Sequence, residues 1–216
     1  MKRLAAGLIA ATLIMTACGS GDDASSTTEQ DDDGRDPDGA DSGVPDDDCV
    51  TSVAERGSDS ESDDLDIPEP TIDGVERFAG LTHGHVEDCV EYLPNPPVGG
   101  DHWGVWQACG FYGDPVPPER AVHSMEHGAV WITYSPDLDA AARDALSVYA
   151  GEFVLVSPWN RDPLPSPVVA SAWGLQLEVE TVDDPRLGEF VNIYANGPQN
   201  REPGAPCVEG GTDETA

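Results

Sequence analysis

We predict a globular domain over residues 75–207, and regular patterns of apolar and polar positions are found only in its second half, after about Pro117. Short β-branched and aromatic runs there predict buried strands, and longer runs with one apolar face predict helices. We expect a helix at 117–127, a strand at 129–134, a helix at 138–150, strands at 153–157 and 168–179, and a helix at 183–194. Alternating Leu175, Leu177 and Val179 predict one buried and one solvent-facing side for the last strand. The order is typical of an α+β fold with helices packed on a small mixed β-sheet.

The first half of the predicted globular domain (75–207) shows little periodicity and is rich in glycine and proline. Proline excludes long helices and central strands, and six of these residues fall here: Pro94, Pro96, Pro97, Pro115, Pro117 and Pro118. We therefore expect an irregular Gly/Pro-rich half, held together by disulfides and by the packing of aromatic side chains.

Acidic residues dominate the charge of the chain. Asp and Glu number 42 against 10 Lys and Arg, for a formal net charge of −32. Residues 18–74 carry runs of aspartate with almost no apolar content, which predicts a disordered acidic tether; residues 208–216 are expected to form a disordered tail. Binding to nucleic acid or to anionic lipid head groups depends on basic side chains, so the composition argues against both.

The first residues have the pattern of a secretory signal. A basic start is followed by an apolar run from Leu4 to Met15 and by small residues around Cys18, which predicts a signal peptide over 1–17. The cysteine is similar to the acylated residue of bacterial lipoproteins. We therefore expect lipidation at Cys18 and a lipid anchor on the extracytoplasmic face of the cell membrane; an ordinary secreted protein is the alternative.

Four further cysteines lie beyond the signal: Cys49, Cys89, Cys109 and Cys207. In an oxidising compartment an even number of widely spaced cysteines favours two disulfides over a zinc–thiolate site. Three pairings are possible, and the spacing does not choose among them.

All five histidines fall between His83 and His127, which indicates a shared site. His123 and His127 are four residues apart, so on a helix both imidazoles could bind one ion. With Glu126 between them they also match the His-x-x-Glu-His motif of inverted zinc metallopeptidases. The short helix and the lack of a clearly placed third ligand argue against a peptidase.

Four motifs together resemble the domain of unknown function 3105 family: Asn95-Pro-Pro-x-Gly-Gly-x-His102-Trp103, Gly110-x-Tyr112, Val122-His-x-x-Glu-His-Gly128 and Ser171-Ala-Trp-Gly174. The resemblance spans about residues 80–207 and implies a secreted or membrane-anchored bacterial protein with no assigned activity. It selects four histidines and Glu126, leaving His83 outside. It also implies a Cys109–Cys207 disulfide, which leaves Cys49 and Cys89 as the second pair.

These patterns support a non-catalytic domain that binds copper or zinc. His102, His123 and His127 are the expected core ligands, with His85 as the fourth, and Glu126 would orient a ligand or hold a water molecule. Two alternatives are a structural or interaction module of the cell envelope without metal, and a zinc hydrolase with Glu126 as general base. The sequence identifies no protein partner.

Overall fold

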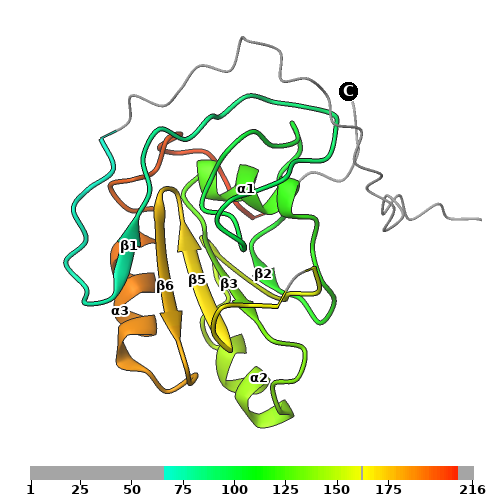
Figure 1. Cartoon of the computed structure of the whole chain (residues 1–216), viewed down its shortest axis with the longest axis vertical. Coiled ribbons are helices and arrows are strands. Elements are labelled where there is room, and N and C mark those ends of the chain that lie inside the picture. Colours follow the sequence, from blue (N-terminus) through cyan, green and yellow to red (C-terminus); the bar gives the residue numbers. More distant parts are fainter. Residues whose placement is uncertain (1–65, 162, 209–216) are drawn as a thin grey trace, which may run out of the picture. The chain divides into compact units, whose positions relative to one another are not determined.

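A six-stranded mixed sheet forms the centre of the molecule, in a computed structural model that describes residues 66–161 and 163–208 (Figure 1). The strand order is β1-β6-β5-β3-β4-β2. The strands are β1 Val75–Arg77, β2 Gly110–Phe111, β3 Val130–Tyr134, β4 Val154–Pro158, β5 Val168–Ala172 and β6 Leu175–Val179. The helices are α1 Pro118–Glu126, α2 Ala140–Ser147 and α3 Pro185–Tyr194. The predicted α+β fold is confirmed.

The sheet is parallel on one side and antiparallel on the other. β4 pairs in parallel with β3 and β2, whereas the β3–β5, β5–β6 and β6–β1 pairs are antiparallel. The Gly/Pro-rich half contributes only the two short edge strands, β1 and β2, as its prolines predict. Figure 1 shows α1 at one end of the sheet and α2 at the other, with the chain of the Gly/Pro-rich half passing around α1.

The strand predicted over 168–179 is in fact a hairpin. β5 and β6 pair with Ala172 opposite Leu175, so Trp173 and Gly174 form a two-residue turn. Gly174 has φ +73, a conformation that glycine adopts without steric cost. A Cβ there would lie 2.8 Å from Ile67 and 2.9 Å from the Phe78 carbonyl oxygen. The apolar residues of both strands concealed the turn in the sequence.

The predicted solvent-facing side of this segment is wrong at Gln176 and right at Glu178, which is exposed. Gln176 is buried, and its Nε2 donates hydrogen bonds to the Pro96 carbonyl at 2.9 Å and to Ser171 Oγ at 3.0 Å. The irregular proline-rich chain therefore packs over this face of β6. Buried amides are retained only when hydrogen-bonded, and Gln176 meets that requirement.

The hydrophobic core begins before the predicted domain boundary at Val75. Ile67 and Ile72 are buried against the sheet residues, and the Ile67 carbonyl accepts a hydrogen bond from Arg77 Nε at 2.8 Å. The end of the predicted tether is thus packed chain. The predicted signal segment, residues 18–65 of the tether and the tail from residue 209 lie outside the described residues.

The described helices are all short, α3 being the longest at 10 residues. Within residues 66–161 and 163–208, no helix combines the length and the apolar composition needed to cross a membrane.

Candidate metal centre

Helix α1 supplies two side chains of the centre. Pro118 occupies its first turn, and Gly128, at φ +100, follows its last residues, as the sequence predicts. His123 and Glu126 are three residues apart and therefore lie on the same helix face. Both are at least 95% buried.

Two histidines from the irregular half are brought to this face by a short parallel pairing of backbone segments. His85 and His102 are bridge partners: Val86 N donates to the His102 carbonyl at 2.8 Å, and His102 N donates to the Gly84 carbonyl at 3.0 Å. The Asp101 carboxylate adds a hydrogen bond from Gly84 N at 2.8 Å. This pairing places the two imidazoles side by side, although the residues are separated in the sequence.

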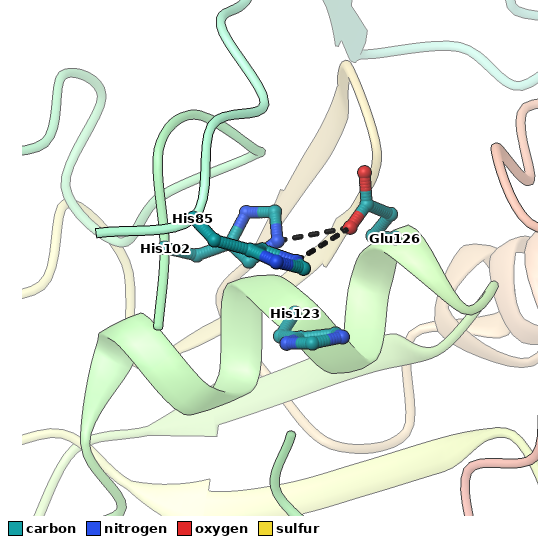
Figure 2. Close-up of side chains that lie close together, drawn as sticks. All are labelled: His85, His102, His123 and Glu126. Atoms are coloured by element: carbon teal, nitrogen blue, oxygen red, sulfur yellow. Dashed lines mark ion pairs between the residues drawn. The ribbon is translucent and has the colours of Figure 1, made fainter. Parts of the chain in front are cut away.

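Three imidazoles and one carboxylate converge. His85, His102, His123 and Glu126 each place a ligand atom within 4.8 Å of those of the other three. The three imidazole rings have centroids 4.9–5.0 Å apart. Figure 2 shows His85 and His102 directed towards the Glu126 carboxylate, with His123 beside them on α1. This cluster could hold a metal ion.

Backbone carbonyls fix the protonation of the two buried rings. His102 Nδ1 lies 2.8 Å from the Gly100 carbonyl oxygen, and His123 Nδ1 lies 2.7 Å from that of Trp103. A carbonyl only accepts hydrogen bonds, so the proton of each neutral ring belongs on Nδ1. Each Nε2 then carries a lone pair. The same arrangement orients histidine ligands in metal sites.

His102 and Glu126 face each other in an unusual way. His102 Nε2 lies 2.9 Å from Glu126 Oε2 but makes no hydrogen bond within the described structure. With the ring proton on Nδ1, two lone-pair acceptors are in contact; with it on Nε2, Nδ1 would face the Gly100 carbonyl in the same way. Only a second proton or a metal ion satisfies both nitrogens. Arg201 Nε, 3.2 Å from Oε1, holds the other carboxylate oxygen.

The pKa values agree with a neutral imidazole beside an ionised carboxylate. Burial lowers the pKa of His123 from 6.5 to about 4; the hydrogen bond to Trp103 raises it, and the neighbouring histidines lower it further. Burial raises the pKa of Glu126, but His102, Arg201 and His123 outweigh it, so the value stays below 4.5. Near neutral pH His123 is therefore unprotonated and Glu126 is anionic.

The centre opens to solvent at His85. His102 is fully buried, whereas the His85 side chain is 57% exposed and its Nε2 lies 3.9 Å from Glu126 Oε2. An open pocket of about 370 Å³ adjoins this side, lined by His83, His85, Glu126, Arg201 and Glu202. An ion can therefore enter past His85. His83, which the family resemblance leaves outside the site, is half-buried at this pocket.

His127 lies next to the cluster but outside it. Its ring centroid is 4.7 Å from that of His123, its Nδ1 is 2.7 Å from the Pro206 carbonyl oxygen, and its Nε2 is 3.4 Å from Glu202 Oε2. Its contacts with Pro206 and Glu202 hold the His127 ring towards the C-terminal segment. The sequence assigned His127 to the ligands and Glu126 to a supporting role; in the described structure Glu126 is the fourth member of the cluster.

Sequence analysis missed Arg201 and Glu202. They follow α3 by several residues and contact Glu126 and His127 across more than 70 positions of sequence. An isolated charged pair in a loop carries no pattern that would point to α1. Their role becomes visible only once the segment 196–207 is placed over the end of that helix.

One disulfide holds that segment in place. Cys109 and Cys207 are bonded, as the family resemblance implied. Cys89 is also disulfide-bonded. Cys49, its predicted partner, and the predicted lipidation site Cys18 lie outside the described residues.

Fold and cluster together define an α+β domain with a His/Glu site suited to a metal ion. Residues 83–209 match the family described as "Protein of unknown function (DUF3105)", and the chain belongs to that family. No curated protein and no solved structure matches the chain.

Proposed function

We propose that the protein is a lipid-anchored, extracytoplasmic domain that binds one transition-metal ion, copper or zinc, through His85, His102, His123 and Glu126, and that it performs no catalysis at this ion. The contact between His102 Nε2 and Glu126 Oε2 carries the proposal. Leaving two buried acceptors face to face is costly, and either a second proton on His102 or a metal ion between them removes that cost. The ligand atoms of His85 and His123 within 4.8 Å favour the metal ion.

The ligand set suits the proposed metals. Imidazole binds zinc and copper, and three histidines with one carboxylate supply four donors. Donor atoms about 2.0–2.1 Å from a tetrahedral zinc are about 3.3–3.4 Å apart. The wider spacings among the four donors, up to 4.8 Å, therefore need a modest contraction, and the 2.9 Å between His102 Nε2 and Glu126 Oε2 needs to open slightly. The exposed His85 side chain is the one free to move inward.

A binding role fits the position of Glu126 better than hydrolysis does. In a zinc hydrolase of the His-x-x-Glu-His type, both histidines bind the ion and the glutamate activates water. Here His127 faces Glu202, and Glu126 fills the coordination position that water would need. Among the described residues, His102 and His123 are buried, and the pocket beside His85 is the route we propose for exchange of the ion.

The proposed location follows from the signal-like first residues and Cys18. With a net charge of −32, attraction to anionic lipid would not hold the chain at a membrane. A covalent lipid would.

Elemental analysis of the full chain, purified without a histidine tag, tests the metal site. We expect about one equivalent of copper or zinc in the wild type. The H102A/H123A double variant should lose the ion, and H85A should bind less of it. Because the His85 side chain is exposed, H85A should fold normally. H83A, at the same pocket but outside the ligand set, is the matched control and should keep the ion. A wild-type protein that takes up no metal, and whose melting temperature chelators do not change, would instead favour the structural module.

A further inference from the structure

We propose a second, weaker transition-metal position beside the first, formed by His127 and Glu202. It is separate from the proposed His85/His102/His123/Glu126 centre and uses the histidine that this centre leaves out. The two positions are close, since the His123 and His127 ring centroids lie 4.7 Å apart.

The His127–Glu202 contact repeats the arrangement at His102 and Glu126. His127 Nδ1 lies 2.7 Å from the Pro206 carbonyl oxygen, so the ring proton belongs on Nδ1 and Nε2 carries a lone pair. That Nε2 is 3.4 Å from Glu202 Oε2, another acceptor. The imidazole is 95% buried and is aimed at the carboxylate. A metal ion accommodates both donors.

Both donors are held in position by the backbone. Pro206 precedes Cys207, which is bonded to Cys109 and whose carbonyl accepts a hydrogen bond from Cys109 N at 2.6 Å. Glu202 N donates to the Glu126 carbonyl at 3.1 Å and to Asn200 Oδ1 at 2.9 Å. The backbone of Glu202 is thus fixed over the end of α1.

The position should be weaker and more exchangeable than the first. Only the first cluster gathers three or more candidate donors within the described part of the chain. The Glu202 side chain is 52% exposed, so water would complete the coordination. His83 lines the same pocket as Glu202.

Equilibrium dialysis of the full, tag-free chain against a series of buffered Zn²⁺ concentrations tests the proposal. A large excess of Mg²⁺ is included, since Mg²⁺ occupies all-oxygen sites on the acidic surface but competes poorly for imidazole. We expect about two equivalents of zinc in two affinity classes. E202Q should lose the weaker class and keep the tighter one. D137N, which removes an exposed carboxylate just past Tyr134, at the end of β3 remote from α1, should retain both.

Three outcomes would overturn the second position: a single class in the wild type, two unchanged classes in E202Q, or loss of both classes in E202Q. A single class would show that His127 and Glu202 share a proton instead. The first centre is judged separately, by whether the tighter class disappears in H102A/H123A. H127A provides a second check: it should match E202Q in zinc bound while retaining the native circular dichroism spectrum.

Discussion

The same kind of hydrogen bond orients three buried imidazoles, those of His102, His123 and His127. In each ring Nδ1 contacts a backbone carbonyl, from Gly100, Trp103 or Pro206, at 2.7–2.8 Å. Such a contact fixes the ring orientation and holds the ring proton on Nδ1, which leaves the lone pair on Nε2. Without the contact, the proton of a neutral imidazole can sit on either nitrogen. Where each of these Nε2 atoms points is therefore decided by loop backbone rather than by the histidine itself.

The lowered pKa of His123 predicts a pH-dependent stability of the metal-free protein. The unfolded chain binds this proton near pH 6.5, and the folded one only near pH 4. Between those values the unfolded state holds more protons, so the free energy of unfolding falls as the pH is lowered. The full effect is on the order of 3 kcal/mol. Urea unfolding of the chelator-treated full chain at pH 5 and pH 7 measures the part between these values, about 2 kcal/mol.

H123Q is the control for that experiment, because its amide can still donate to the Trp103 carbonyl but does not titrate. Its unfolding free energy should change less between the two pH values than that of the wild type. Staying above pH 4.5 avoids the window in which Glu126 adds its own dependence. Equal slopes in the two proteins would contradict a depressed pKa at His123.

At the level of elements, α1 and the segment Asn196–Cys207 act as one unit. Asn196 N donates to the Gly128 carbonyl at 2.8 Å, and Asn200 Nδ2 would lie 2.5 Å from a Cβ at residue 128. The same segment provides Arg201 for Glu126 and the Pro206 carbonyl for His127. The segment Asn196–Cys207 thus provides both the hydrogen-bond donors for free carbonyls at the end of α1 and the contacts that support the centre.

Removing the Cys109–Cys207 disulfide should therefore weaken metal binding as well as the fold. C109A/C207A is expected to lose about 2–5 kcal/mol of stability and to bind zinc about tenfold or more weakly, the usual effect of losing contacts that orient ligands. Denaturant unfolding and zinc competition titrations measure the two effects.

L146A distinguishes a specific effect from general instability. Leu146 is buried in α2, at the opposite end of the sheet from α1 (Figure 1), and its truncation should cost about 2–5 kcal/mol. We expect its zinc affinity to match the wild type. A disulfide variant that binds zinc as tightly as L146A would show that the segment does not support the centre.

The elements that could be predicted from sequence are those defined by local patterns. Local signals predicted four elements that the structure contains. Pro118 and Gly128 mark the ends of α1, apolar runs mark β3 and β4, and Asp184 precedes α3. α2 is shorter than predicted. The hairpin turn at Gly174 was missed because apolar residues continue across it. Gln176 was misassigned because the covering chain has no periodicity.

The candidate site was predictable in composition but not in arrangement. Clustering in sequence identified the histidines, whereas copper or zinc, suggested by the imidazole ligands, stays a prediction. The exchange of roles between Glu126 and His127 depends on where α1 ends and on a segment some 75 residues later. A helical spacing of four places two side chains on one face, but it does not say which backbone carbonyl will turn each ring.

For the whole molecule, charge sets which surfaces the protein can approach. The net charge of −32 attracts cations and repels anionic surfaces over about a Debye length, 8–10 Å in ordinary salt. This favours encounter with free metal ions. It works against peripheral attachment to a bilayer, which relies on basic residues, and this is why we propose a covalent lipid as the anchor.

C18S tests the proposed anchor in bacterial cells that express the full chain. The wild type should sediment with membranes and remain there after a high-salt wash, because salt screens charge but does not release buried acyl chains. C18S should appear in the soluble extracytoplasmic fraction with its metal content unchanged, since the centre is built from residues 85–126. S20A, two residues further on, is the control and should stay with the membrane. If C18S still sediments after the salt wash, something other than acylation of this thiol holds the chain at the membrane. Because the acidic composition disfavours direct lipid binding, a bound partner protein would then be the next candidate.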